Sequence, residues 1–245
     1  MDKINELKKM IDECNHIVVF TGAGVSTDSG LKDFRSKNGL YKEKTSIYPP
    51  EYMLSSDCFY EHTEEFYDYY KDNFNCLDTL PNDTHKFIKK LEDIHKLSCV
   101  ITQNIDGLHT KAGNKKVFEV HGTIYKNHCI KCNKIYDADY VFNSSGVPKC
   151  SCGGIIKPNV VLYGEMLPEV DYLGGLNAIN NADMLIVCGS SLTVYPASGM
   201  VDSFHGKYLV IINNDKTGYD DMANLVINDN LAKVSKELLK VIWWN

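Results

Sequence analysis

The chain has 245 residues and a mass of 27.7 kDa, so it fits one large domain, or one domain with a small satellite, and excludes a multidomain array. Hydrophobic residues make up 44% and charged residues 24%, a composition that excludes disorder as the main state. The net charge of −6 provides no general attraction for phosphate backbones. Without an evident basic patch, we expect no specific nucleic-acid partner.

The sequence shows no stretch approaching the ~20 apolar residues of a membrane-spanning helix, and its N-terminus is typical of an amphipathic helix rather than a signal peptide. We therefore expect a cytoplasmic protein that binds no membrane and is a monomer. In a reducing cytosol, nine cysteines are more typical of metal ligands, buried thiols or reactive thiols than of disulfides. The chain holds a single arginine, Arg35, whose position invites a functional explanation.

Short apolar runs rich in β-branched residues alternate with amphipathic segments along most of the chain. They predict buried strands at 16–20, 97–102, 184–188 and 208–212, and helical patterns at 84–95 and 173–180 precede two of these strands. Further helices are predicted at the N-terminus and over 232–242, the latter followed by Trp243 and Trp244. Strands that alternate with helices form parallel sheets covered on both faces, so the fold class is α/β.

Two segments interrupt this alternation. Residues 31–82 are rich in tyrosine and acidic side chains, have helical spacing at Phe59, Phe66 and Tyr70, and contain no clear buried strand, so they predict a helical insertion. Residues 126–157 hold four cysteines but too few apolar residues for a core of their own. They predict a small module stapled by a metal ion.

The clustered cysteines form two close pairs, Cys129-x-x-Cys132 and Cys150-x-Cys152, with 17 residues between them. Two such pairs can surround one tetrahedral ion, and thiolate ligands favour Zn²⁺ over a hard cation. Four sulfur ligands leave no position for a reacting water, so the site would be structural. An Fe–S site, a redox pair and free thiols are the alternatives, and His128 is an alternative ligand.

A run of small residues, Gly22-Ala23-Gly24, follows the first predicted strand and would open a helix, so its N–H groups could approach a pyrophosphate. The third glycine of the dinucleotide fingerprint is missing, and no acidic residue ends a strand about 20 residues later, which disfavours an ordinary dehydrogenase. A plain glycine turn is the alternative. Arg35 favours the phosphate site, because a guanidinium suits two-pronged phosphate contact, although a salt bridge to Asp33 is the other interpretation.

Polar side chains follow the predicted strand at 97–102, in the run that holds Gln103, Asn104 and Asp106. They lie at the edge where open α/β sheets bind ligands, and they suit ribose and amide recognition, although Asn104 or Asp106 could equally cap a helix. His121 follows the apolar-flanked run 117–120, and a histidine with a pKa near ~6.5 is a natural general base. For His109 we favour a structural role.

Six separated motifs together resemble the bacterial type of the sirtuin (Sir2-like) family of NAD-dependent protein deacylases, in the family's order and over nearly the whole chain. They are the glycine loop with 33–36, the run 102–109, Val120-His121-Gly122, the four cysteines, 164–168 and 189–196. The resemblance implies a discontinuous Rossmann-like NAD-binding domain formed by 1–31, 83–125 and 158–245. It also implies a small domain, formed by a helical insertion with a cofactor loop at 32–82 and a zinc-ribbon module at 126–157.

The resemblance also implies where NAD binds. The nicotinamide pocket would consist of Phe34, Ile105 and Asp106, with Gln103 and Asn104 on the nicotinamide ribose. Asn213 would hold the adenine ribose, and Asn228-Asp229 replaces the family's glycine region near the expected adenine contacts. The remaining expected contacts are Gly22, Ala23, Gly24, Thr27, Arg35, Gly189, Ser190, Ser191, Asn230 and Leu231.

The implied activity is the transfer of an acyl group from lysine to ADP-ribose, with His121, Asn104 and Asp106 as catalytic residues. The acyl oxygen would attack C1′ of the ribose as nicotinamide leaves, and His121 would deprotonate the ribose diol so that its 2′-oxygen attacks the imidate. Acylated peptides or proteins would bind by strand addition, which gives weak sequence preference. The expected substrate contacts are Val161, Tyr163, Gly164, Glu165 and Val194.

The chain departs from parts of the family pattern. Desuccinylating members carry Tyr-x-x-Arg, whereas this chain has Tyr67-x-x-Tyr70, so an acidic acyl group would lack a cation and we predict deacetylation, with longer neutral acyl chains also accepted. Lys32 replaces the usual proline before Asp33, which predicts a more flexible cofactor loop. The alternatives are a mono-ADP-ribosyltransferase or NAD hydrolase, which would use the same pocket, and a non-catalytic NAD sensor or interaction module.

Overall fold

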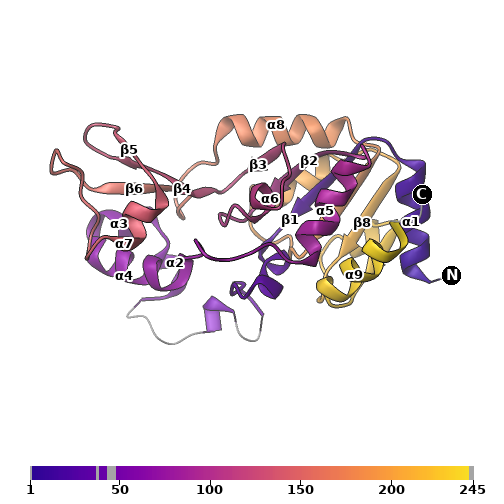
Figure 1. Cartoon of the computed structure of the whole chain (residues 1–245), viewed down its shortest axis with the longest axis horizontal. Helices are drawn as coiled ribbons and strands as arrows, with labels where there is room; N and C mark the ends of the chain where they lie inside the picture. The colour runs from indigo at the N-terminus through magenta and orange to yellow at the C-terminus, as the bar shows by residue number, and fades with distance from the viewer. Residues whose placement is uncertain (1, 37–38, 43–47, 243–245) are drawn as a thin grey trace.

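The computed structural model describes residues 2–36, 39–42 and 48–242, and its centre is a six-stranded sheet (Figure 1). The strand order is β3-β2-β1-β7-β8-β9, and every pairing in this sheet is parallel, which confirms the α/β class. Trp243 and Trp244 lie outside the described residues. The strands are Ile17–Thr21 (β1), Leu97–Thr102 (β2), Val117–Glu119 (β3), Met184–Cys188 (β7), Tyr208–Ile212 (β8) and Leu225–Ile227 (β9).

Helices cover both faces of the large sheet because side chains along its central strands alternate between two cores. Ile17 and Val19 of β1 pack with α1, α5 and α9, whereas Val18 and Phe20 pack with α8 and the 3₁₀ segment η4. The covering elements are α1 (Lys3–Glu13), α5 (Asp83–Asp93), α8 (Glu169–Asn180), η4 (Ser198–Ser203) and α9 (Leu231–Ile242).

The direction of the strand order reverses at β1. From β1 the chain runs outward through β2 to β3, and it later returns to β7, beside β1, and runs outward through β8 to β9. Such a reversal leaves a crevice at the carboxyl ends of the two central strands, where open α/β sheets bind ligands. The fold therefore places a candidate site beyond Thr21 and Cys188.

A three-stranded antiparallel sheet, in the order β5-β4-β6, lies at the other end of the molecule from α1 and α9 (Figure 1). One hydrophobic cluster joins this sheet to the helical insertion, since Phe59 and Phe66 pack with Ile124 and Ile156. The two interrupting segments thus form one small unit, whose expected boundaries at 125/126 and 157/158 fall inside β4 and β6. The unit contains α2 (Pro50–Met53), α3 (Ser56–Glu61), α4 (Thr63–Phe74), β4 (Gly122–Cys129), β5 (Ile135–Tyr136), α7 (Ala138–Asn143) and β6 (Ile156–Val160).

The sequence predicts most of these elements, with one clear difference after β1. The α-helix expected behind the glycine loop is replaced by two 3₁₀ turns, because the run of Gly, Ser and Thr there has little helix propensity, and Gly30 ends the second turn with φ +90°. The remaining short elements are η1 (Ala23–Val25), η2 (Thr27–Ser29), η3 (Leu40–Lys42), α6 (Leu108–Lys111) and η5 (Asp220–Met222).

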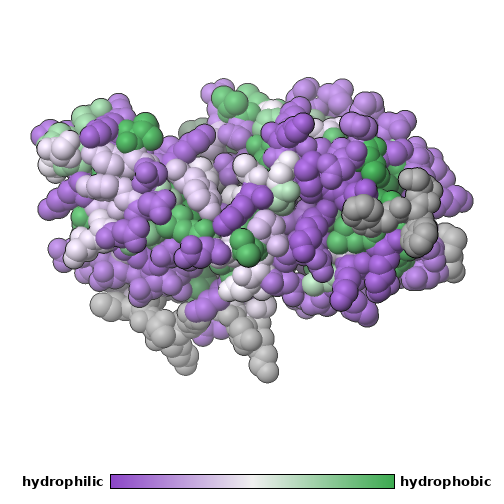
Figure 2. Space-filling view, in the orientation of Figure 1, coloured by the Kyte–Doolittle hydropathy of each residue, from purple (hydrophilic) through white to green (hydrophobic). Residues whose placement is uncertain are grey.

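The visible surface is mostly hydrophilic, and apolar side chains gather over the beginning of α8, where Val170 and Leu173 are exposed (Figure 2). Isolated exposed apolar groups of this kind are common on folded proteins. None of the helices in the described ranges combines the length and the apolar character needed to cross a membrane.

Candidate active site

A cleft of about 410 Å³ opens at the carboxyl edge of the large sheet and is also lined by the small unit. Every residue that the sequence predicts for cofactor, substrate or catalysis lines this cleft, except Asn230. The Asn230 side chain instead accepts a hydrogen bond from the Lys233 N–H at 3.0 Å, at the start of α9. The predicted residues in the cleft are Gly22, Ala23, Gly24, Thr27, Phe34, Arg35, Gln103, Asn104, Ile105, Asp106, His121, Val161, Tyr163, Gly164, Glu165, Gly189, Ser190, Ser191, Val194, Asn213 and Leu231.

Two glycine turns meet at the floor of the cleft, one after β1 and one after β7. The Gly24 N–H donates to the Gly189 carbonyl at 2.9 Å, and a Cβ on Gly24 would lie 2.8 Å from the Cα of Gly189. A Cβ on Gly22 would also lie 2.9 Å from the Gly189 carbonyl oxygen. Glycine is therefore required at these positions for the turns to approach each other.

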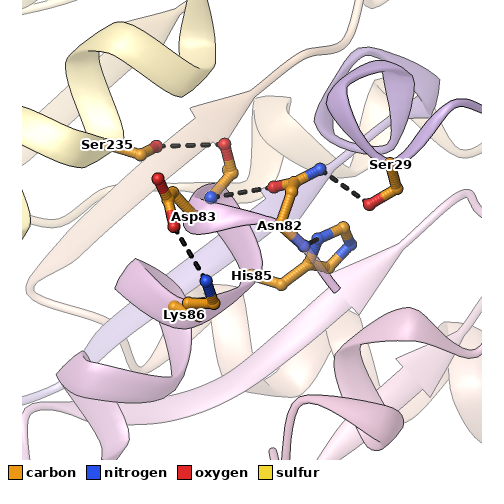
Figure 3. A network of polar contacts seen from close by, with 7 residues as sticks. Ser29, Asn82, Asp83, His85, Lys86 and Ser235 are labelled. Carbon is orange, nitrogen blue, oxygen red and sulfur yellow. Dashed lines mark hydrogen bonds and ion pairs between the residues drawn. The ribbon is translucent and has the colours of Figure 1, made fainter. Parts of the chain in front are cut away.

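Asn82, just before α5, holds the same glycine loop from the opposite side (Figure 3). Its side-chain amide donates to the Val25 carbonyl at 2.8 Å and to Ser29 Oγ at 3.0 Å, while its oxygen accepts from the Thr84 N–H at 2.8 Å. Ser235 of α9 donates to Thr84 Oγ1 at 3.1 Å. Sequence reasoning missed Asn82, although an Asn directly before a predicted helix is a standard capping signal.

A buried polar cluster lies between the loops after β1 and β2. The Ser26 hydroxyl donates to Asp106 Oδ2 at 2.6 Å, and the Asn104 amide donates to Ser26 Oγ at 3.1 Å. The Leu108 N–H, at the start of α6, donates to Asp106 Oδ1 at 2.9 Å, although the capping position of this helix belongs to Gly107. Burial raises the pKa of Asp106, and these hydrogen bonds oppose that rise. Sequence reasoning assigned no role to Ser26, yet Ser26 joins two of the three catalytic candidates, Asn104 and Asp106.

His121 is oriented by a backbone carbonyl. Its Nδ1 lies 3.0 Å from the carbonyl oxygen of Gln103, and because a carbonyl can only accept, Nδ1 carries the proton and Nε2 keeps its lone pair. Burial lowers the pKa of His121, and the hydrogen bond with Gln103 opposes this effect. The cleft therefore presents a neutral imidazole whose Nε2 can accept a proton.

The loop after η2 closes over the cleft through aromatic contacts. The Phe34 ring lies 5.5 Å from the Tyr41 ring and 6.3 Å from the Phe74 ring, and the Arg35 guanidinium lies 5.3 Å above the Tyr41 ring. The Tyr41 hydroxyl is hydrogen-bonded to that of Tyr163, a predicted substrate contact. Arg35 thus makes a cation–π contact on one wall of the cleft.

The four cysteines of the small unit come together as predicted. The sulfur atoms of Cys129, Cys132, Cys150 and Cys152 all lie within 4.8 Å of one another, and three of the pairs are 3.5 to 3.6 Å apart. Disulfide sulfurs would be ~2.05 Å apart, whereas a tetrahedral Zn²⁺ with Zn–S bonds of ~2.3 Å separates its ligands by about 3.8 Å. The sulfur–sulfur distances therefore fit a closed zinc site and are too long for a disulfide-bonded redox pair.

We expect removal of the metal to unfold the small unit, because the cysteine module has no sufficient core of its own. A loss of about 3 kcal/mol would lower the melting temperature of a chain of this size by roughly 6–12 °C. Thermal unfolding and zinc content, measured before and after chelation and in Cys129→Ser, test this expectation. Cys14→Ser, outside the cluster, should keep its zinc. A chelated protein with an unchanged melting curve would contradict it.

Asn82→Asp should weaken NAD binding about tenfold, because it keeps the acceptor for the Thr84 N–H but removes both donors to the glycine loop. Ser235→Ala is the matched control, since it removes a hydrogen bond at the far side of the same network. Calorimetric titration with NAD measures both variants, and melting curves report their stability. An equal loss of NAD affinity in the two variants would refute a specific role for Asn82.

The comparisons with known proteins agree with this geometry. The model of the Sir2 family matches residues 22–196. The chain is 49% identical to an NAD-dependent protein deacetylase of Clostridium acetobutylicum, over 98% of this chain and 99% of that protein. It is 50% identical to an NAD-dependent protein deacetylase of Clostridium perfringens, over 95% and 97% of the two chains.

Solved structures resemble the whole chain as well. A Sir2 protein with a deacetylated p53 peptide and 3′-O-acetyl ADP ribose has a TM-score of 0.89 and 37% identity, over 97% of this chain and 98% of that chain. A Sir2 complex with a p53 peptide and NAD⁺ has a TM-score of 0.86 and 38% identity, with the same coverage. The chain therefore belongs to the Sir2 family.

Proposed function

We propose that His121, Asn104 and Asp106 perform the chemistry of an NAD-dependent protein lysine deacetylase, the activity of the family to which this chain belongs. The observation that carries this assignment is that a neutral imidazole lines the same cleft as a buried carboxylate and amide, beside the glycine loop. NAD is the co-substrate, and the zinc-fitting cysteine cluster has a structural role.

NAD would lie along the carboxyl edge of the large sheet. Ala23, Thr27 and Arg35 would hold the pyrophosphate, with Ser190 and Ser191 beside the phosphates and adenosine. In support, all five residues line the cleft. The Ser190 hydroxyl accepts from the Gln103 side-chain amide at 2.8 Å, which links the phosphate side to the ribose side. Asn213 and Leu231 extend the same wall toward the adenosine half.

The nicotinamide ring would be enclosed by Phe34 and Ile105, with Asp106 accepting from the carboxamide. The acyl oxygen of the substrate lysine attacks C1′ of the ribose, and the bond to nicotinamide breaks with its electron pair. His121 Nε2 then takes a proton from the ribose diol, and the 2′-oxygen attacks the imidate carbon. The C–N bond to lysine then breaks as the amine leaves with a proton, and a water molecule adds to the acyl carbon, so the released products are lysine, nicotinamide and O-acetyl-ADP-ribose.

The acyl-peptide would enter between the segment after β6 and the loop after β7, with Val161 and Tyr163 along the acyl-lysine path. The residues at the acyl-selecting positions favour neutral groups. Tyr67 donates its hydroxyl to the Ile156 carbonyl and does not line the cleft, whereas Tyr70 lines it and stacks on Phe66 with ring centres 5.6 Å apart. Neither side chain offers the cation that a buried acyl carboxylate needs.

We further propose that the protein acts in the cytoplasm and as a monomer. The nine cysteines of the chain are all free of disulfides, as expected in a reducing compartment.

The test of the function is mass spectrometry of an acetyl-lysine peptide incubated with the protein, with and without NAD. We expect NAD-dependent loss of acetyl with formation of O-acetyl-ADP-ribose, a loss of at least about 100-fold in His121→Ala, and little turnover of a succinyl-lysine peptide. ADP-ribosylated peptide, or free ADP-ribose without deacetylation, would instead show transferase or hydrolase activity. NAD left intact with the acetyl peptide would support a sensor.

The pH profile tests the role of His121. Burial lowers its pKa below the usual ~6.5, and the neutral form is active, so kcat/KM should be level near pH 7 and fall as the pH drops through a midpoint below ~6.5. His85, with a pKa lowered by burial to about 4, lies below this window. A midpoint above ~7 in the measured profile would contradict the assignment. Glu119, whose pKa burial raises to about 7, is outside the cleft, so Glu119→Gln should leave the midpoint unchanged.

A further inference from the structure

Lys157 is the only buried lysine among the described residues, and it lies on β6 just before the substrate segment. Its Nζ is 3.0 Å from Glu165 Oε1 and 3.1 Å from Glu165 Oε2. It also donates to the Pro158 and Val160 carbonyls at 3.4 and 3.5 Å, and it lies 5.8 Å from the Phe59 ring centre. The ammonium group is therefore held by several partners away from bulk water.

The Glu165 carboxylate is engaged by groups of the protein itself, with a quarter of the side chain exposed. Oε2 accepts from the Leu162 N–H at 3.0 Å, and the Glu165 N–H donates to the Leu162 carbonyl at 2.9 Å. The carboxylate thus closes the turn 162–165, in which Gly164 has φ +92°. Gly164 and Glu165 of this turn both line the cleft.

The other end of the ion pair is fixed by the small sheet. Lys157 pairs with His128 of β4, and the next pair is Cys129 with Ile156, so the register of the lysine is set beside a metal-binding cysteine. The ion pair consequently connects the zinc-holding sheet to the turn that lines the cleft. Removing one partner of a buried ion pair leaves an uncompensated charge, which would displace this turn.

We propose that Lys157 is a positioning residue for the acyl-peptide, acting through the Glu165 carboxylate on the turn 162–165. The inference rests on the proposed function only in naming an acyl-lysine peptide as the ligand. It assigns to Glu165 a role for its side chain that differs from direct substrate contact. The proposal predicts weaker peptide binding without weaker NAD binding, because the turn borders the peptide path whereas NAD would be held by the loops after β1 and β7.

The test measures the dissociation constant of a fluorescently labelled acetyl-lysine peptide, and separately that of NAD, for variants at this pair. Lys157→Met should weaken peptide binding about tenfold and leave NAD binding within about twofold. Lys157→Arg should restore peptide binding to near the wild-type value, since a guanidinium can form the same pair. Lys207→Met, which breaks the exposed pair with Glu13, is the matched control and should change neither constant.

A second variant distinguishes a loss of peptide positioning from a loss of the folded state. Lys157→Met/Glu165→Leu removes both charges, so we expect it to keep the wild-type melting temperature while still binding the peptide weakly, because the turn has lost its closing carboxylate. Wild-type peptide affinity in Lys157→Met, or an equal loss of peptide and NAD affinity, would overturn the proposal. A wild type that binds the peptide but does not deacetylate it would overturn the proposed function alone.

Discussion

The site depends on the complete burial of β1. Ile17–Thr21 is buried along its whole length, with β2 and β7 hydrogen-bonded on its two sides and helices on both faces. A strand in this environment cannot carry polar chemistry on its own side chains, so the chemistry must lie in the loops beyond its carboxyl end. Gly22 and Gly24 allow the loop to turn there against Gly189, at a distance that a Cβ would prevent. The crevice left by the reversal of strand order thus becomes a cleft whose floor is formed by the backbone of the two glycine turns.

The buried polar groups next to the glycine loop are either uncharged or satisfied by hydrogen bonds. Asp106 is buried, but each of its carboxylate oxygens accepts a hydrogen bond, one from Ser26 and one from the Leu108 N–H. His109 is bonded to Thr21 Oγ1 at 3.0 Å, and burial lowers its pKa, so it stays uncharged as the structural role predicts. Arg35, the single arginine of the chain, lines the cleft together with Lys32.

Local patterns in the sequence were sufficient for the elements whose environment repeats along the chain. The strands β2, β7 and β8 begin and end where the apolar runs predict. A largely buried strand coincides with a short apolar run, so the ends of the run mark the ends of the strand. The spacing of the two cysteine pairs likewise predicts that they come together. The Rossmann-like domain and the expected cleft residues came from the resemblance of several motifs taken together, since no single motif determines them, and the order of the strands was not predicted.

Other features depended on contacts between distant segments and left no local signal. Asn82 caps its own helix and also reaches Val25, 57 residues away, and only the first role is visible in a pattern. Asn230 occupies a position expected to contact adenine, yet it caps α9, because the first turn of a helix has N–H groups that need an acceptor. The direction of the Glu165 carboxylate was equally hidden, since its partner lies on another strand.

One strand joins the proposed base to the cysteine cluster. β4 starts at Gly122, directly after His121, and ends at Cys129, and the His121 carbonyl accepts from the Val161 N–H at 2.8 Å, where β4 and β6 meet. β4 pairs with β6 at Gly122 and again at 127–129, with an irregular register between these points, and with β5 at Asn127 and His128. Zinc at the cluster would therefore act on the histidine only indirectly, because it would hold the far end of a strand whose two ends are anchored in the same small sheet.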